Sequence, residues 1–256
     1  MRLVDGTHLV GGGAWGPYLS NAFDANVYLV QSGDEAALVD AGIGLATDAI
    51  CENIISAGLS LSQIRWILLT HCHADHSGGV AALKRLTGAR VVASKACAEA
   101  VERGTDALIL GSALRHQYCE LSDWDFEPCK VDVLIEGEDA VPLGRGAVTV
   151  IPSPGHSEDH LAYAFGGSFD VPTMLFSGDC VFFGGTILLQ NVPGCRIDAY
   201  AETICRLAHR PVELLLPGHM FFALRDGASH IRAAARAFAD RRVPPNVDIP
   251  HAALAM

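Results

Sequence analysis

The sequence predicts a mixed α/β (α+β) fold, built as a four-layer αββα sandwich. Apolar runs typical of strands alternate with helical apolar spacing along most of the chain, and they fall into two β-rich halves. With 256 residues, half of them hydrophobic, the chain can bury a substantial core. Two sheets that each carry helices on one face satisfy both observations, so we expect a single domain over residues 1–256.

Strands are predicted where apolar residues run together, and helices where they recur every three or four positions. In the first half we predict strands over 26–30, 36–40, 64–69 and 90–93, and helices over 46–57, 80–86 and 95–103. In the second half we predict strands over 131–136, 147–151, 161–165, 173–177 and 212–216, and helices over 198–209 and 225–241. Residues from about 104 to 128 break this rhythm, so we predict a helical or loop insertion there.

A cluster of polar residues separates the strand 64–69 from the helix 80–86. It reads Thr70-His71-Cys72-His73-Ala74-Asp75-His76-Ser77-Gly78-Gly79, with three histidines and one aspartate within six residues. No regular helix or strand aims these four side chains the same way, so the chain must turn here. A bound divalent metal stabilises such a convergence of polar side chains, because neutral imidazole and carboxylate are its natural ligands. A junction of this kind is also where α/β proteins usually bind ligands.

Three later motifs share one design, in which an apolar strand is followed by a glycine-containing turn and one metal-capable residue. They are Pro154-Gly155-His156, Ser177-Gly178-Asp179 and Pro217-Gly218-His219. Glycine lets the backbone turn sharply where a side chain must point into a shared cleft. One such motif is common in ordinary loops. All three in order after the histidine cluster predict that these residues share one metal-binding centre.

Charge and hydropathy exclude several classes of partner. The net charge is −11 and no run of Lys and Arg stands out, which disfavours nucleic acid and anionic membrane surfaces. No stretch reaches the roughly 18 apolar residues that a membrane span needs. Asp5 interrupts the start too early for a signal-peptide core, so we expect a cytoplasmic protein. The expected partner is a small-molecule substrate, and the oligomeric state stays open.

The eight cysteines form no Cys-x-x-Cys pair, and without a secretion signal we predict free thiols rather than disulfides. Cys72 and Cys180 each stand beside a proposed metal ligand. Their oxidation would therefore disturb the site even if neither thiol binds metal.

With these residues the chain resembles the metallo-β-lactamase fold superfamily of hydrolases. The likeness extends from Leu38-Val39-Asp40-Ala41-Gly42 to His219 and includes five motifs: Asp40, the His71/His73/Asp75/His76 cluster, His156, Asp179 and His219. It implies an αββα sandwich of the metallo-β-lactamase type with a binuclear metal site. The runs 154–160 and 177–185 are similar to glyoxalase II and related thioester hydrolases, which favours that branch.

The resemblance also implies a role for each site residue. The ligands would form two triads and a bridge: His71, His73 and His156; Asp75, His76 and His219; and Asp179. Asp40 would orient a ligand histidine through its free ring N–H, or else it only caps a strand end. His160 is either a structural histidine at a helix start or a group that supports the ligands from outside. Two divalent ions are implied, with Zn²⁺ as the default and iron or manganese able to use the same ligands.

Such a site is implied to use a metal-bridging hydroxide as the nucleophile, with Asp75 accepting the proton of the attacking water. We therefore predict a metal-dependent hydrolase of a small thioester, ester or lactone. The alternatives are a phosphodiesterase, a mononuclear-iron thiol dioxygenase and a non-hydrolytic metal-binding sensor. The metal content of the protein distinguishes these alternatives, because two zinc ions per chain favour hydrolysis, whereas one iron ion favours oxygen chemistry.

Four aromatic residues are candidates for substrate contact. Trp15 and Tyr18 lie in a glycine-rich loop that is either a flap over the acyl group or an ordinary hairpin loop. Trp124 belongs to the insertion, which we predict to be a lid opposite that loop. Phe182 stands where similar lactonases carry a tyrosine. The stretch after His219 is short for the helical domain that grips glutathione in glyoxalase II, so we expect the lid to choose the acyl group.

Overall fold

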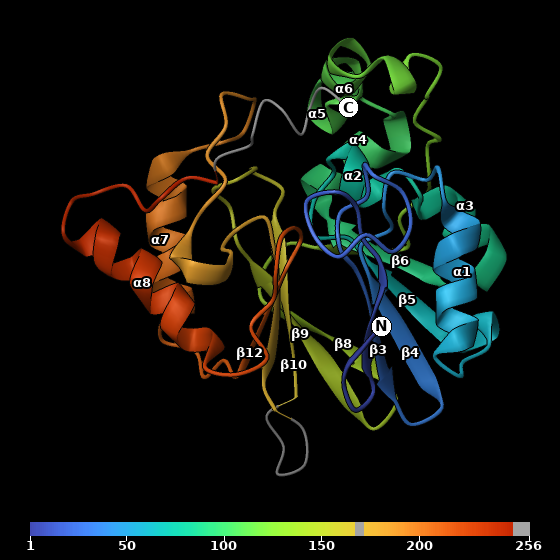
Figure 1. The fold of residues 1–256 in the computed structure, drawn as a ribbon, viewed down its shortest axis with the longest axis horizontal. Helices are drawn as coiled ribbons and strands as arrows, with labels where there is room; N and C mark the ends of the chain where they lie inside the picture. Colours follow the sequence, from blue (N-terminus) through green and yellow to red (C-terminus); the bar gives the residue numbers. More distant parts are fainter. Residues whose placement is uncertain (167–171, 248–256) are drawn as a thin grey trace.

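The computed structural model describes residues 1–166 and 172–247, in which two β-sheets pack face to face with helices on both outer sides (Figure 1). Across the first sheet the seven described strands lie in the order β1 (Arg2–Val4), β2 (Thr7–Gly11), β3 (Val27–Ser32), β4 (Glu35–Val39), β5 (Ile64–Leu68), β6 (Arg90–Ser94) and β7 (Val133–Ile135). Across the second sheet the five described strands lie in the order β12 (Leu214–Pro217), β11 (Met174–Gly178), β10 (Leu161–Phe165), β9 (Gly146–Pro152) and β8 (Asp139–Leu143). The predicted αββα sandwich is confirmed.

Strand direction brings several carboxyl ends to the same end of the sandwich. In the first sheet β4, β5, β6 and β7 run parallel to one another. In the second sheet β12 is parallel to β11, and β10 is antiparallel to both β9 and β11. The chain therefore leaves β9, β11 and β12 in one direction. Ligands in open α/β folds bind outside such carboxyl ends.

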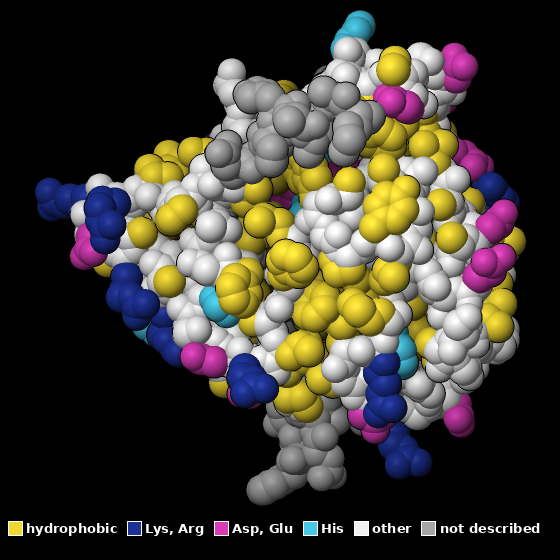
Figure 2. All heavy atoms as spheres, viewed as in Figure 1, with side chains coloured by type: hydrophobic (Ala, Val, Ile, Leu, Met, Phe, Trp, Pro, Cys, Tyr) yellow, Lys and Arg dark blue, Asp and Glu magenta, His cyan; other side chains and the backbone are white. Residues whose placement is uncertain are grey.

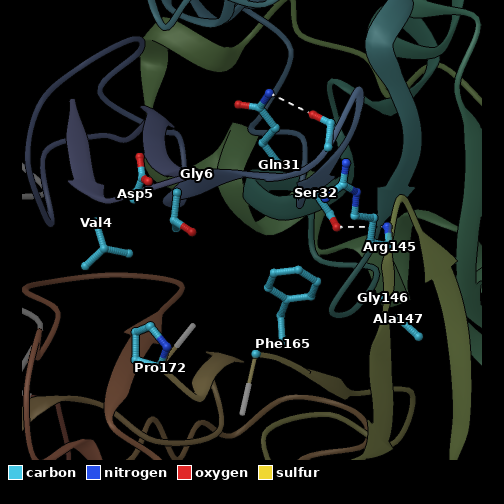
Figure 3. A pocket seen from close by; sticks show the side chains of 13 residues that line it. Val4, Asp5, Gly6, Gln31, Ser32, Arg145, Gly146, Ala147, Phe165 and Pro172 are labelled. Carbon is cyan, nitrogen blue, oxygen red and sulfur yellow. Dashed lines mark hydrogen bonds between the residues drawn. The ribbon is translucent and has the colours of Figure 1, made fainter. Parts of the chain in front are cut away.

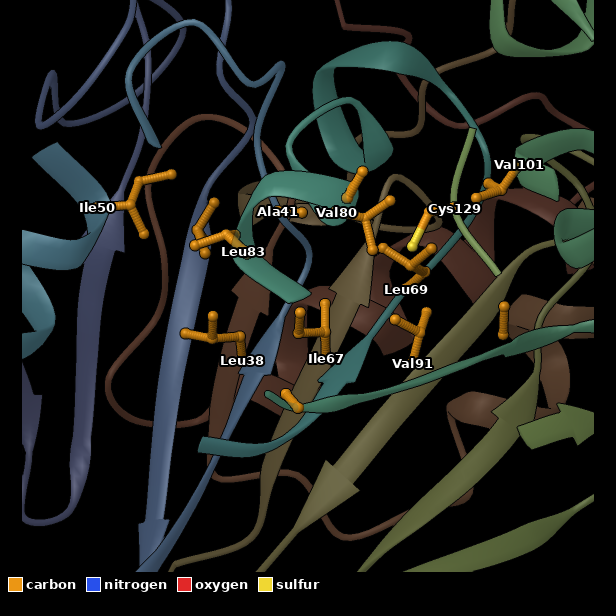
Figure 4. Close-up of a cluster of buried hydrophobic side chains, with 14 of the residues drawn as sticks. Leu38, Ala41, Ile50, Ile67, Leu69, Val80, Leu83, Val91, Val101 and Cys129 are labelled. Carbon is orange, nitrogen blue, oxygen red and sulfur yellow. The ribbon is translucent and has the colours of Figure 1, made fainter. Parts of the chain in front are cut away.

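The first sheet is covered by α1 (Thr47–Ser56), α3 (Val80–Thr87) and α4 (Lys95–Arg103). Figure 4 shows the strand residues Leu38, Ile67 and Val91 in one cluster with the helix residues Ile50 and Leu83, and all five are almost completely buried. The second sheet is covered by α7 (Ile197–Leu207) and α8 (Gly227–Ala239). A third cluster, between the sheets, is centred on large buried side chains: Tyr28, Leu68, Tyr163 and Phe176.

Every predicted strand and helix is present, with ends that agree within two residues. Three strands were not predicted: β1, β2 and β8. The first two are short and lie among glycines. The third is an edge strand that begins at an exposed aspartate and contains Pro142, which an edge strand tolerates because its outer N–H positions need no partner.

The predicted insertion folds as α5 (Asp106–Ile109), α6 (Gly111–Gln117) and the 3₁₀ turn η2 (Cys119–Leu121). Other short helical turns are η1 (Leu61–Gln63), α2 (Ala74–Ser77) and η3 (Phe183–Gly185). Within the described part of the chain, no helix has both the length and the apolar character needed to cross a membrane. All eight cysteines are free. The division into domains stays a prediction.

The helix α3 offers a matched test of the outer core. Leu83 is fully buried against the first sheet, whereas Leu86 is 50% exposed on the same helix. We expect Leu83→Ala to lower the free energy of unfolding by about 2–5 kcal/mol, because it removes buried apolar contacts and leaves a cavity. Leu86→Ala should change it by less than about 0.5 kcal/mol. Urea denaturation followed by circular dichroism measures both, and equal losses would contradict the packing described.

Candidate metal centre

Five strand ends deliver the predicted site residues to one end of the sandwich. Asp40 follows β4, the His71–His76 cluster follows β5, His156 follows β9, Asp179 follows β11 and His219 follows β12. The ligands thus come from both sheets, although they are up to 148 positions apart in the chain. The site lies in the crevice where such folds bind ligands.

The turn after β5 is fixed by close backbone contacts. The His76 N–H donates to His73 O at 3.0 Å, and the Ala41 N–H donates to His76 O at 2.8 Å, which joins the turn to the end of β4. Gly79 lies so close that a Cβ there would stand 2.2 Å from Ala41 O. Only glycine therefore allows the helix α3 to start where the cluster needs it.

The first group of ligands consists of His71, His73 and His156. His73 Nδ1 lies 3.0 Å from both His71 Nε2 and His156 Nε2. One ring nitrogen of each can be chosen so that all three lie within 4.8 Å of one another. His156 Nδ1 donates to Leu188 O at 2.9 Å, which leaves the Nε2 lone pair facing the cluster.

The second group consists of Asp75, His76 and His219. His219 Nε2 lies 3.1 Å from Asp75 Oδ2 and 3.3 Å from His76 Nε2. The Asp179 carboxylate faces both groups, with Oδ2 3.6 Å from His156 Nε2 and 3.5 Å from His219 Nε2. Its Oδ1 makes no hydrogen bond to any residue that the structure describes. The Asp179 carboxylate thus lies between the two groups.

Asp40 and His160 contact the ligands from outside. Asp40 Oδ2 lies 2.8 Å from His76 Nδ1, and Asp40 Oδ1 accepts the Thr70 N–H at 2.7 Å. His160 Nε2 accepts the Asp179 N–H at 3.1 Å, and its ring stacks on His71 with centroids 5.1 Å apart. Since His160 precedes the strand β10, the alternative of a histidine at a helix start is wrong.

The electrostatics of the cluster favour a cation. Burial, with the neighbouring His76 and His73, holds the pKa of His71 well below its usual value. Burial also lowers the pKa of His219, but the carboxylates of Asp179 and Asp75 outweigh this and raise it to about 9. Among the described residues, the ion pairs of Asp40, Asp75 and Asp179 are all with histidines. A buried set of imidazoles and carboxylates without Lys or Arg fits divalent metal ions.

A cleft of about 190 Å³ opens onto both groups of ligands. Its walls come from three segments: Trp15 in the loop after β2; Ile109, Leu110 and Tyr118 in the insertion; and Leu188, Gln190 and Val192 in the loop after η3. A second cavity of about 700 Å³ lies at the opposite ends of the strands and is shown in Figure 3. The described residues that line it include no histidine or cysteine, so the ligand chemistry belongs to the smaller cleft.

The candidates for substrate contact are placed differently from one another. Trp15 lines the cleft, and its ring packs edge-on against His219 at 5.3 Å. Tyr18 is 64% exposed and Phe182 is fully buried, and neither is among the described residues that line the cleft. Trp124 is also absent from the lining, because it is buried in the outer core and donates to Ile43 O at 3.1 Å. It supports the insertion from behind and does not face a substrate.

The wall residues that the sequence did not reveal are mostly ordinary: Leu110, Tyr118, Leu188 and Gln190. Nothing in their spacing distinguishes them from core or loop residues. Only the packing of three distant segments around the ligands brings them together. Position in the insertion was the one available signal, and it applied to Tyr118 as much as to Trp124.

Comparison with known proteins agrees with this geometry. The model of the Metallo-beta-lactamase superfamily matches residues 20–219, and the chain belongs to this superfamily. Hydroxyacylglutathione hydrolase of Anaeromyxobacter dehalogenans is 32% identical over 162 residues, which cover 63% of this chain and 48% of that protein. Acyl-coenzyme A thioesterase MBLAC2 of Homo sapiens is 29% identical over 215 residues, which cover 76% of this chain and 72% of that protein.

These relatives support the glyoxalase II-like branch of the superfamily, although the chain spans only about half the length of the hydroxyacylglutathione hydrolase. Among solved structures, a metallo-β-lactamase from Cronobacter sakazakii has a TM-score of 0.72 at 24% identity and covers 94% of this chain and 95% of that chain. The subclass B3 enzyme BJP-1 of Bradyrhizobium japonicum has a TM-score of 0.67 at 23% identity, covering 94% and 92%. At this identity the likeness shows the fold alone.

Asp40 provides a test of the support around the ligands. Asp40→Asn removes the charge that faces His76 Nδ1, so the ring loses its anchor while the side chain keeps its size. We expect divalent-metal affinity to fall about 10–100-fold. Competition with a chromophoric chelator measures this affinity. The control Asp34→Asn, at an exposed hairpin turn, should bind metal like the wild type. An unchanged affinity in Asp40→Asn would show that Asp40 only ends a strand.

Proposed function

We propose that this protein is a binuclear metal-dependent hydrolase that cleaves a small thioester, ester or lactone. The observation that carries the proposal is the convergence of two ligand groups on one carboxylate, Asp179, at the floor of a cleft. The names of the relatives add support, since one is a hydroxyacylglutathione hydrolase and another an acyl-coenzyme A thioesterase. Both names denote hydrolysis of a thioester.

The proposed cofactors are two Zn²⁺ ions. His71, His73 and His156 would hold one ion, Asp75, His76 and His219 would hold the other, and Asp179 would contact both. When bound, such a pair supplies an activated water at neutral pH and polarises the substrate carbonyl. The remaining contributions come from the protein: His156 and His76 are oriented by Leu188 O and Asp40, and burial shields the histidines from bulk water.

Asp75 is proposed to accept the proton of the attacking water. Burial alone would raise its pKa, but His76 and His219 lower it to about 2, so the side chain is a carboxylate at neutral pH. Its side chain is 26% exposed, whereas those of His76, His219 and Asp179 are at most 7% exposed. A proton taken up at Asp75 Oδ2 can therefore be passed on to solvent, which the more deeply buried groups do not allow.

The cleft favours a small acyl group. Its volume of about 190 Å³ lies below the range of about 300–1,000 Å³ that is usual for drug-sized ligands, so a large leaving group would extend outside it. Each of the three segments that form its walls contributes an apolar side chain: Trp15, Leu110 and Leu188. On the face shown in Figure 2 hydrophobic side chains gather centrally and Lys and Arg lie mainly toward the edges. This supports a small carbonyl compound rather than a phosphodiester polymer.

A substrate panel tests the proposal. Purified protein is loaded with Zn²⁺ and assayed with thioesters, esters, lactones, β-lactams and phosphodiesters, and its metal content is measured by mass spectrometry. We expect a pair of zinc ions per chain and turnover of a carbonyl substrate that a chelator abolishes and added Zn²⁺ restores. Cleavage of phosphodiesters alone would overturn the substrate class. A single iron in protein purified without added metal would favour oxygen chemistry instead.

Asp75→Asn separates metal binding from turnover. The variant leaves His71, His73 and His156 intact, so we expect it to keep much of one equivalent of metal. Loss of the proton acceptor should lower kcat about 10²–10⁴-fold. The control Asp34→Asn should match the wild type in both metal content and kcat. Full activity in Asp75→Asn would show that this carboxylate is neither the base nor a necessary ligand.

A further inference from the structure

A smaller cavity, here called the side pocket, adjoins the cleft at the proposed proton acceptor. Its volume is about 70 Å³. Part of its lining is shared with the cleft: Trp15, Asp75, Tyr118 and His219. The rest comes from the loop between β2 and β3: Ala22, Phe23 and Asp24. Since Asp75 Oδ2 lies 3.1 Å from His219 Nε2 and both residues line both cavities, the cleft and the side pocket meet at this pair.

The side pocket is accessible from solvent. The aromatic residues that line it are all partly exposed, and so is Ala22. The Asp75 side chain is 26% exposed. Among the described residues, no member of the first group of ligands lines this pocket, so it approaches the centre from the second group alone. The cleft and the side pocket therefore reach the Asp75–His219 pair from different sides.

The side pocket offers a ligand mainly apolar surface. The oxygens of Asp24 already accept hydrogen bonds from neighbouring groups: the Ile43 N–H at 2.7 Å, the Asn21 N–H at 3.0 Å and the Ser20 hydroxyl. The ring of Phe23 packs edge-on against that of Tyr118 with centroids 4.9 Å apart, which fixes two of the walls. Aromatic walls with a methyl group beside them favour methylene groups over polar ones.

The position of Asp75 decides which part of a substrate the side pocket suits. When water attacks a thioester, a C–O bond forms at the carbonyl carbon, the C–S bond breaks, and its electron pair leaves with the sulfur. Asp75 accepts a proton from the attacking water, and the sulfur takes up this proton to give the free thiol. The leaving atom must therefore pass close to Asp75, where the two cavities meet.

We propose that the side pocket receives the first carbon atoms of the leaving thiol or alcohol, while the acyl group occupies the cleft. The inference rests on the proposed hydrolysis of a thioester, ester or lactone. A volume of about 70 Å³ corresponds to roughly two or three groups of the size of a water molecule. The pocket therefore admits an unbranched alkyl leaving group and excludes one that is branched at the carbon bonded to sulfur or oxygen.

The test uses the zinc-loaded full chain and the butanoyl thioesters of three thiols. Propane-1-thiol is unbranched and apolar, 2-mercaptoethanol carries a hydroxyl in place of its methyl group, and 2-methylpropane-2-thiol is branched at the carbon bonded to sulfur. Each kcat/KM is divided by the rate constant for hydrolysis by hydroxide, which corrects for intrinsic reactivity. We expect the propyl thioester to exceed the hydroxyethyl thioester about three- to tenfold. It should exceed the branched thioester by about tenfold or more.

Matched substitutions assign these preferences to one cavity. Ala22 lines only the side pocket and Ala113 only the cleft. Ala22→Leu narrows the side pocket, so the advantage of the propyl thioester should fall about tenfold while the ratio between acetyl and butanoyl thioesters stays unchanged. Ala113→Leu makes the same change in the cleft and should alter only the acyl ratio. Phe23→Leu widens the side pocket and should raise the relative rate of the branched thioester. Zinc content is measured for each variant, so that loss of metal is not mistaken for a change of preference.

Each outcome decides a different point. If no thioester, ester or lactone is cleaved, the proposed function fails. If thioesters are cleaved but the corrected rates do not depend on the leaving group, the role of the side pocket is overturned while the proposed function stands. The same holds if Ala22→Leu changes the acyl ratio instead of the leaving-group ratio. Should Ala22→Leu fold poorly, Phe23→Leu decides the point, because an unchanged rate of the branched thioester then contradicts the proposal.

Discussion

The structure depends on one constraint, which is that imidazoles and carboxylates from five strand ends must share a small buried space. Gly218 shows how tight this space is. A Cβ there would stand 2.4 Å from Asp179 Oδ1 and 2.6 Å from His76 Cε1, so no other residue leaves room for the neighbouring ligands. Gathering such groups away from water is unfavourable unless a cation compensates them. The glycines of the ligand turns are therefore consequences of the metal chemistry and not merely of the need to turn the chain.

Because the ligands come from both sheets, the site requires the two sheets to keep their relative position. The hydroxyl groups of two tyrosines help to hold that position. The Tyr163 hydroxyl of the second sheet donates to Leu69 O, just before the histidine cluster, at 2.6 Å. The Tyr28 hydroxyl of the first sheet donates to Pro217 O, just before Gly218 and His219, at 2.7 Å. Each sheet thus fixes a ligand-bearing strand end of the other. The buried interface between the sheets is at once the core and the frame of the metal centre.

The contrast between the ligands and the walls of the cleft explains what the sequence could predict. Strands, helices and ligands follow local rules of periodicity, turn chemistry and donor type, so the helix 95–103 and the strand 161–165 were predicted to the residue. The walls of the cleft follow no local rule. Trp124 was expected to contact the substrate because it is aromatic and lies in an insertion, yet its indole N–H is used by Ile43 O in the core. Gln190 carries no sequence signal, because its place in the cleft wall is set only by tertiary packing.

The walls are nevertheless not independent of the ligands. Trp15 O accepts the N–H of Met220, the residue after His219, and Leu108 O accepts the thiol of Cys72, the residue between His71 and His73. Leu188 O accepts the ring N–H of His156 directly. Each wall segment is therefore hydrogen-bonded to a proposed ligand or to its neighbour in the chain, so the positions of the walls and of the ligands are linked. Some side chains project from these segments and make none of the anchoring hydrogen bonds. Substitution of these side chains can change the choice of substrate while the metal centre is kept.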